Sequence, residues 1–270
     1  MPESRKPIQQ PPDRTETLAD YFDRLFGPVL SDPWAARLVE AADLVAGQHV
    51  LDVACGSGAV AIAASERVGP AGTVTGLDRN PDMLAVARRK RPELEWRNGS
   101  AEELPFDDGM FDVTLCQFGL MFFEDPSRAV AEMLRVLRPG GRTAVAVWDG
   151  LERSPGYSAL VEVLELHLGA EVAAPVRDSF ALGDPALVES LLGTAGFTAV
   201  TVGSQEARAR FPSLRHWVDA ELKGWVGADL DQRTYTELMA DASRTLAPFI
   251  QADGHTDFAL PAVIGVGTKG

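Results

Sequence analysis

The chain has 270 residues, of which 46% are hydrophobic and 24% charged, and this supplies enough apolar surface for one large α/β domain. The formal net charge of −14 disfavours a nucleic acid as the main partner, because phosphate contacts need a basic face. No apolar run approaches the ~20 residues that a membrane-spanning helix requires, so we expect no membrane insertion.

The N-terminal segment MPESRKPIQQPPDR, residues 1–14, has no apolar core. We therefore predict a disordered tail rather than a secretory signal or an anchor. The two cysteines, Cys55 and Cys116, have no CxxC or zinc-like spacing, so we predict no metal site and do not expect a disulfide. A reducing, cytoplasmic setting fits this cysteine content best.

Two helices are predicted before the first strand. The segment TETLADYFDRLFGPVL has apolar residues at helical spacing, and Asp32-Pro33 predicts the capped start of a helix that ends near Asp43.

From residue 48 onward, predicted strands and helices alternate. The strands are expected at 48–53, 72–77, 93–97, 111–116 and 142–148, with helices near 58–67, 81–89 and 126–137. This alternation predicts a parallel sheet with helices on both faces.

After Trp148 the alternation breaks. We expect a helical piece in 151–183, a capped helix from Asp184-Pro185 to near Gly196, a long strand over FTAVTVGSQEARARF, mostly helix in 213–250, and a terminal strand in FALPAVIGVGTKG. Without a visible linker, residues 15–270 are predicted to form a single domain. Its helical cover segments, at 15–46, 151–183 and 213–250, would lie over the ligand edge of the sheet.

The segment VLDVACGSGAVA, residues 50–61, predicts a buried strand, a glycine-rich turn and a helix. Its glycines satisfy the loose dinucleotide pattern, and Asp78 follows at the end of the next strand, where a carboxylate suits ribose hydroxyls. Asp52 decides between ligands, because it would repel a pyrophosphate but attract the ammonium and sulfonium groups of S-adenosylmethionine (SAM). These residues favour SAM.

Four segments in order, VLDVACGSG, VTGLDRNPDML, GSAEELPFDDGMFDV and RVLRPGGRTAVAVW, resemble the motifs of class I SAM-dependent methyltransferases. More narrowly, they resemble the subgroup of ubiquinone and menaquinone biosynthetic C-methyltransferases, over about residues 34–148. The resemblance implies a doubly wound, mostly parallel, seven-stranded, Rossmann-like α/β sheet with a helical cover over the strand carboxyl ends.

The resemblance also implies contacts to the cofactor. They are Asp52, Ala54, Gly56 and Gly58 around the methionyl part, Asp78 on the ribose, Arg79 and Met83 beside the adenine, Ser100, Ala101 and Glu102 along its edge, and Gln117 under the methionine. The family usually has aspartate where this chain has Ser100, and a neutral hydroxyl accepts a weaker hydrogen bond.

Four residues are candidates for the acceptor side. Tyr21, Phe122 and Trp148 belong to segments expected to converge at the strand ends, where their rings could shape an apolar pocket, although core packing is the default reading of such residues. His216 lies in the predicted cover and could serve as a base, a packing role being its alternative.

We therefore predict an enzyme that transfers the methyl group of SAM to a small organic acceptor, aromatic or lipophilic, by in-line displacement, with no catalytic residue assigned. An NAD(P)-dependent oxidoreductase is the alternative that the glycine pattern allows, and a non-catalytic SAM-binding protein is the second. The sequence does not select the acceptor, its attacking atom or the oligomeric state.

Overall fold

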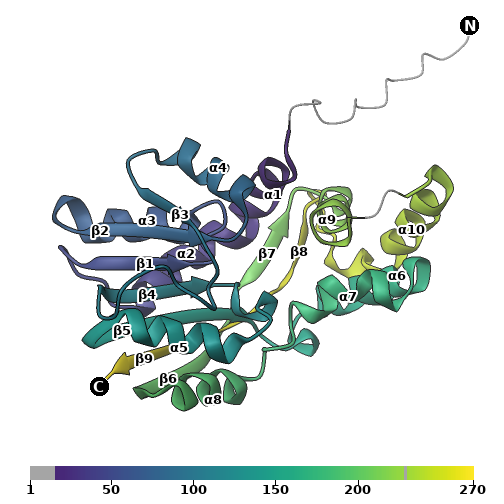
Figure 1. Cartoon of the computed structure of the whole chain (residues 1–270). Coiled ribbons are helices and arrows are strands. Elements are labelled where there is room, and N and C mark those ends of the chain that lie inside the picture. The colour runs from purple at the N-terminus through teal and green to yellow at the C-terminus, as the bar shows by residue number, and fades with distance from the viewer. Residues whose placement is uncertain (1–15, 228–229) are drawn as a thin grey trace, which may run out of the picture.

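The computed structural model describes residues 16–227 and 230–270, so the predicted tail lies outside the described residues. Its centre is a seven-stranded sheet in the order β3-β2-β1-β4-β5-β9-β6 (Figure 1). The strands are β1 (His49–Val53), β2 (Thr73–Asp78), β3 (Glu95–Asn98), β4 (Phe111–Gln117), β5 (Leu137–Trp148), β6 (Phe197–Gln205) and β9 (Ala262–Lys269). Only β9 runs antiparallel to its neighbours in this sheet, so the predicted mostly parallel, seven-stranded fold is confirmed.

Helices cover both faces of this sheet, each above its own apolar cluster. One face carries α2 (Asp32–Ala41), α3 (Ala59–Val68) and α4 (Pro81–Lys90), and the other carries α5 (Pro126–Val136) and α8 (Pro185–Ala195). The strands between them are buried on both sides, as the apolar runs in the sequence require.

A second layer of helices lies beside the carboxyl ends of the parallel strands (Figure 1). It consists of α1 (Leu18–Phe26), α6 (Pro155–Leu168), α7 (Ala170–Asp178), α9 (Leu214–Glu221) and α10 (Gln232–Thr245). Short 3₁₀ or π segments are η1 (Gly27–Ser31), η2 (Gly69–Ala71), η3 (Leu120–Phe122), η4 (Leu151–Arg153), η5 (Leu222–Val226) and η6 (Ala247–Phe249).

Two sequence predictions about strands are wrong. The long strand over 197–211 divides into β6 and β7 (Arg208–Phe211), and the terminal strand divides into β8 (Thr256–Ala259) and β9. β7 and β8 pair with each other in a separate two-stranded sheet under the helical layer. Pro261 separates β8 from β9, because proline has no N–H to continue a strand ladder.

Cys55 and Cys116 are both buried and both are free thiols.

The start of α3 depends on a glycine that a side chain could not replace. Gly58 has φ +89°, and a Cβ built on it would lie 2.5 Å from Cη2 of Trp96 on β3. We expect Gly58→Ala to lower the free energy of unfolding by about 2–5 kcal/mol, from about 1–2 kcal/mol of left-handed strain and about 1–3 kcal/mol of overpacking. Urea unfolding measures this.

Gly56→Ala is the matched control. Gly56 also has a positive φ, +52°, but a Cβ added to it would meet no atom within 4 Å, so only the strain of about 1–2 kcal/mol should appear. Equal losses in the two variants would show that the Trp96 ring moves aside at little cost.

Candidate active site

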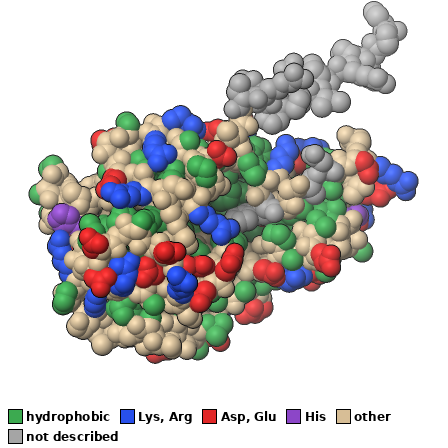
Figure 2. Space-filling view, in the orientation of Figure 1, with side chains coloured by type: hydrophobic (Ala, Val, Ile, Leu, Met, Phe, Trp, Pro, Cys, Tyr) green, Lys and Arg blue, Asp and Glu red, His purple; other side chains and the backbone are tan. Residues whose placement is uncertain are grey.

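A cavity of about 370 Å³ lies at the carboxyl ends of β1, β2 and β4 and extends under the helical layer. Its volume falls in the range of about 300–1,000 Å³ that is typical of small-molecule sites. In the space-filling view, hydrophobic side chains fill the hollow between the sheet and the helical layer (Figure 2). Each of the three predicted cover segments contributes to the wall, with Phe22, Tyr157 and Glu221 as examples.

The turn after β1 forms the floor of the cavity. Ala54 and Gly56 both have positive φ angles, +57° and +52°, and both line the wall. A non-glycine residue in this region is strained, and such strain is often found where a backbone is shaped for a ligand. A Cβ on Gly119 would come within 2.8 Å of the Ala54 Cβ, so two small residues keep this end of the cavity open.

Asp78, at the end of β2, fastens this turn. Its Oδ2 accepts a hydrogen bond from the Gly56 N–H at 2.8 Å, and its Oδ1 accepts one from the Asn80 N–H at 2.8 Å. Burial raises the pKa of Asp78, and the hydrogen bonds from Asn80 and Gly56 oppose that rise. Each carboxylate oxygen keeps a further lone pair, so the group can still accept hydroxyl hydrogens from a ligand.

Asp52, in β1, is only 1% exposed although it lines the cavity. Its Oδ2 accepts a hydrogen bond from the Ala61 N–H at 2.9 Å, in the first turn of α3. Burial raises the pKa of Asp52 well above its usual value, and the nearby charge of Asp78 raises it further. A cation in the cavity would stabilise the ionised form of this carboxyl group.

Gln117 supplies a second acceptor at the same end. Its Nε2 donates to the Ser31 carbonyl at 2.9 Å, while its Oε1 is buried without a hydrogen-bond partner in the described part of the chain. An unsatisfied buried acceptor costs free energy that a ligand N–H would recover. Asp52 and Gln117 together therefore fit an ammonium group.

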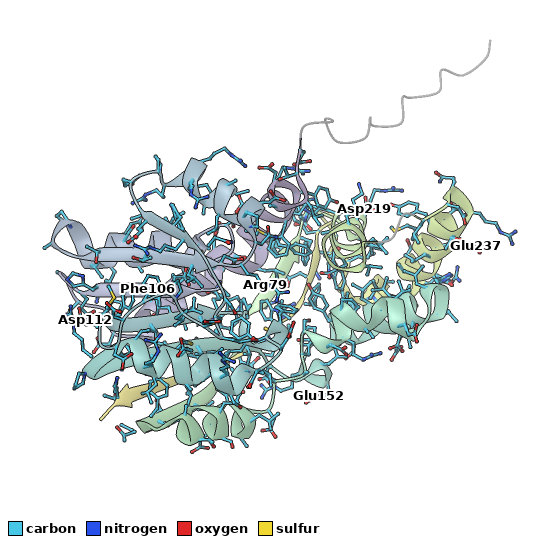
Figure 3. All side chains as sticks on the ribbon, in the orientation of Figure 1. Arg79, Phe106, Asp112, Glu152, Asp219 and Glu237 are labelled. Atoms are coloured by element: carbon cyan, nitrogen blue, oxygen red, sulfur yellow. The ribbon has the colours of Figure 1, made fainter. Side chains whose placement is uncertain are left out.

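The residues predicted for the adenine also lie in the wall, namely Arg79, Met83, Ser100, Ala101 and Glu102. Figure 3 shows Arg79 at the boundary between the sheet and the helical layer. The Ser100 hydroxyl accepts from the Glu102 N–H at 3.1 Å, so it caps its own turn. The Glu102 carboxylate accepts from the Asp125 N–H at 3.1 Å, which holds this loop against the start of α5.

Three predicted site residues lie elsewhere, because Gly58, Tyr21 and His216 do not line the cavity. Gly58 packs against Trp96 instead. The Tyr21 hydroxyl donates to the Asp219 carbonyl at 3.2 Å, and its neighbour Phe22 faces the cavity. Successive helical residues point about 100° apart, so the wall includes Phe22 and not Tyr21.

Two of the aromatic residues predicted for the acceptor, Phe122 and Trp148, line the cavity. The Trp148 ring stacks on Phe118, with centroids 3.6 Å apart and planes 15° apart. Phe118 also has a positive φ, +52°, which directs the chain out of β4 beside the cavity.

Sequence reasoning missed Tyr157, Phe180 and Glu221, which line the cavity from the helical layer. The Tyr157 hydroxyl donates to Glu221 Oε1 at 2.6 Å. The sequence does contain an indication of Glu221, because this carboxyl group lies at helical spacing with Leu214, Trp217 and Val218 on the apolar face of α9.

The described residues contain neither a candidate metal centre nor a candidate membrane span. Across residues 16–227 and 230–270, no three His, Cys, Asp or Glu side chains cluster in a way that could hold a metal ion. No described helix combines the length and the apolar character needed to cross a bilayer.

Comparison with known proteins agrees with this geometry. Residues 51–145 match the methyltransferase domain family. A demethylmenaquinone methyltransferase of Chlorobaculum parvum is 31% identical over 214 residues, which cover 77% of this chain and 88% of the relative. The chain belongs to the class I SAM-dependent methyltransferases.

The match to other relatives is more local. The demethylmenaquinone methyltransferase of Renibacterium salmoninarum is 44% identical over 132 residues, but these cover 48% of this chain and 54% of the relative, so the similarity spans about half of each. The crystal structure of a Bacillus halodurans protein proposed to be a methyltransferase has the same fold, with a TM-score of 0.58 and 22% identity over 87% of this chain and 98% of that one.

Membership of this methyltransferase family identifies the cofactor as SAM, in agreement with the sequence prediction. When bound, SAM supplies an activated methyl group on a sulfonium. The comparisons give no support to the oxidoreductase or to the non-catalytic binding protein.

Proposed function

We propose that this methyltransferase transfers the methyl group of SAM to a small lipophilic or aromatic acceptor by in-line displacement. The observation that carries the proposal is that one cavity is lined both by polar groups and by aromatic rings. Its polar lining includes Asp52, Asp78 and Gln117, and its aromatic lining includes Phe118 and Trp148.

In this proposal the polar part binds the cofactor. Asp52 and the unpaired Oε1 of Gln117 hold the ammonium group, and Asp78 holds the ribose hydroxyls. The adenine lies between Arg79 and Met83 on one side and the loop Ser100–Ala101–Glu102 on the other. These side chains fix the sulfonium so that its methyl group faces the aromatic part.

Alignment is the main catalytic contribution, because the sulfonium is already a good leaving group. Holding the attacking atom, the methyl carbon and the sulfur in line can supply about 7–11 kcal/mol of the barrier. The relatives are named for methylation of demethylmenaquinone, a lipophilic quinone, and the apolar wall of this cavity suits an acceptor of that class.

We propose further that residues 15–270 act as one domain in a cytoplasmic enzyme. All three cover segments contribute to the wall of a single cavity, which supports the first statement. The two free, buried cysteines fit a reducing compartment and support the second.

Calorimetric titration with SAM, S-adenosylhomocysteine, NAD and NADP tests the cofactor assignment. We expect binding of the first two and not of the nicotinamide cofactors, since a pyrophosphate would meet Asp52. A preference for NAD or NADP would overturn the proposal. Incubation with methyl-labelled SAM and quinol or phenol acceptors then tests turnover.

A further inference from the structure

The Tyr157–Glu221 pair joins two helices of the cover at the cavity wall. Tyr157 lies on α6 and Glu221 at the end of α9, and their side chains meet through the 2.6 Å hydrogen bond. Tyr157 is 5% exposed and Glu221 is 1% exposed, yet both line the same cavity as the predicted SAM residues.

The surroundings of this pair are aromatic and uncharged. The Tyr157 ring packs against Phe180, Trp217 and Phe258, with centroids 5.2, 5.4 and 5.6 Å away. Gly156 lets α6 approach β8 closely, since a Cβ there would lie 2.5 Å from the Phe258 ring. The pair is therefore held rigidly.

No cation balances Glu221 among its described neighbours. The two polar groups beside its carboxyl group are the Tyr157 hydroxyl and the Trp217 indole, and neither carries a positive charge. The indole N–H of Trp217 has no hydrogen-bond acceptor in the described chain. The other titratable groups of the cavity wall belong to the sheet side, namely Asp52, Cys55, Asp78, Arg79 and Glu102.

Stability does not explain a carboxyl group in this position. A buried ionisable group without a cation costs free energy, and an apolar pair of similar volume would pack as well or better. An ionisable group that is buried and also faces a ligand cavity is a candidate for chemistry.

We propose that Glu221 is the general base of the methyl transfer, that Tyr157 positions its carboxylate, and that the acceptor is a hydroxyarene whose hydroxyl proton Glu221 takes. This inference rests on the proposed function and names the substrate class of the same cavity. A flat aromatic acceptor fits the wall that Phe118, Trp148 and Phe180 provide.

The hydroxyl proton of the acceptor moves to the Glu221 carboxylate, and the O–H electron pair becomes available on the oxygen or, through the ring, on the adjacent carbon. That atom forms the bond to the methyl group, and the electron pair of the broken methyl–sulfur bond stays on sulfur. If carbon attacks, its own proton then leaves to water and the ring regains aromaticity. Glu221 afterwards releases its proton to water.

The protonation of Glu221 suits this role. Burial raises its pKa to about 8, while the hydrogen bond from the Tyr157 hydroxyl opposes the rise. A general base works best when its pKa lies near the working pH, because it is then both available and basic. If the ionised form is the active base, the rate should rise with pH and reach half of its maximum near pH 8.

The first test measures binding and needs no turnover. Protein loaded with S-adenosylhomocysteine is titrated at pH 8.5 with 4-propylphenol and with its methyl ether, 4-propylanisole. The wild type should prefer the phenol by about 10–100-fold, because a carboxylate accepts its hydroxyl hydrogen. In Glu221→Gln a neutral acceptor remains, so the preference should shrink to about 2–10-fold.

Tyr235→Phe is the matched control. Tyr235 also donates to a carboxylate, Asp219 Oδ1, at 2.7 Å, and Asp219 lies on α9 as well, but neither residue lines the cavity. This variant should keep the full preference for the phenol. Equal binding of the two probes to the wild type, or no binding of either, would overturn the inference.

The second test follows methyl transfer from SAM to 1,4-naphthalenediol. Glu221→Gln should lower kcat by about 10²–10⁴-fold with an unchanged Kd for SAM. Tyr157→Phe removes a bond that lowers the pKa of Glu221, so the rising limb of its pH–rate profile should move to higher pH. Tyr235→Phe should leave the profile in place.

The outcomes separate this inference from the proposed function. Failure of the wild type to bind SAM would end the proposed function itself. Bound SAM with a normal kcat in Glu221→Gln would leave the methyltransferase standing and overturn the role of Glu221. Bound SAM with methylation of amines and not of hydroxyarenes would overturn the acceptor class.

Discussion

Replacing Asp78 with alanine is expected to weaken SAM binding by about 10²–10⁴-fold. A hydrogen bond to a charged group contributes about 1.5–3 kcal/mol, and the ribose offers two hydroxyls to this carboxylate, while each 1.4 kcal/mol corresponds to a factor of ten. The substitution also removes the acceptor of the Gly56 and Asn80 N–H groups, so the turn that forms the floor of the cavity is no longer held by these two hydrogen bonds. Isothermal titration calorimetry measures the change.

The control for Asp78→Ala is a neighbouring carboxylate outside the cavity. Asp82, in the first turn of α4, is exposed and does not line the wall, so Asp82→Ala should leave SAM affinity unchanged. Urea unfolding of both variants shows how much of the loss comes from the fold. An Asp78→Ala protein that binds SAM like the wild type would show that the ribose lies elsewhere.

Methylthioadenosine adds a second readout for the same variant. This molecule keeps the adenosine of SAM and lacks its amino acid part. If Asp78 binds the ribose, the alanine variant should lose affinity for methylthioadenosine and for SAM by similar factors. A loss confined to SAM would place Asp78 at the amino acid end.

The parallel part of the fold could be predicted from the sequence because its information is local. The strands β2 and β4 are short apolar runs that end at Asp78 and Gln117, while β1 runs directly into the glycine-rich turn, and the structure places these ends at one edge. The predicted cofactor residues follow these same ends, so predicting the strands also predicted where these residues gather.

The two-stranded sheet could not be predicted in this way. β7 pairs with β8, about 50 residues later in the chain, with Arg208 opposite Ala259. No local pattern specifies that pairing, and Glu206 and Ala207, which separate β6 from β7, are not typical turn residues. Pro261 was the one local indication that the last strand is divided.

The acceptor side of the cavity depends on tertiary contacts. Tyr157 and Glu221 are 64 positions apart, and only the packing of α6 against α9 and β8 brings them together. The choice of Tyr21 over Phe22 depended on the rotation of α1, which its neighbours fix. The sequence does place Glu221 at helical spacing with the apolar residues of α9, and this was a stronger indication of a site residue than the aromatic ring of Tyr21.

Asp52→Asn is expected to weaken SAM binding by about 10–100-fold and to leave methylthioadenosine binding unchanged. The carboxylate is proposed to hold the ammonium group, and a charged hydrogen bond contributes about 1.5–3 kcal/mol. Methylthioadenosine lacks that group and should not sense the substitution. Equal losses for both ligands would indicate a collapsed cavity rather than a missing charge.

The same variant should remove a pH dependence of SAM binding. Burial raises the pKa of Asp52 in the cofactor-free protein, whereas an ammonium group favours the ionised form, so binding releases a proton. Wild-type affinity should therefore fall as the pH is lowered through the raised pKa. In Asp52→Asn the contribution of Asp52 to the pH dependence of SAM affinity vanishes. Any pH dependence that is left in this variant then comes from other groups such as Asp78, whose pKa is also raised.

Stability of the cofactor-free protein should change in the opposite direction from binding. Because the folded-state pKa of Asp52 lies above the ordinary aspartate value of 3.8, the stability that this group contributes is complete below that value and is lost as the pH rises through the folded pKa. Asparagine can still accept from the Ala61 N–H and has no proton to lose. Relative to the wild type, Asp52→Asn should thus gain stability as the pH rises from the ordinary aspartate value through the raised folded-state pKa, which urea unfolding at a low and a high pH measures. If the difference in the free energy of unfolding between the two proteins is the same at both pH values, Asp52 keeps an ordinary pKa. In that case the buried carboxyl group does not cost the cofactor-free protein stability, and the argument that it is buried in order to bind a cation loses this support.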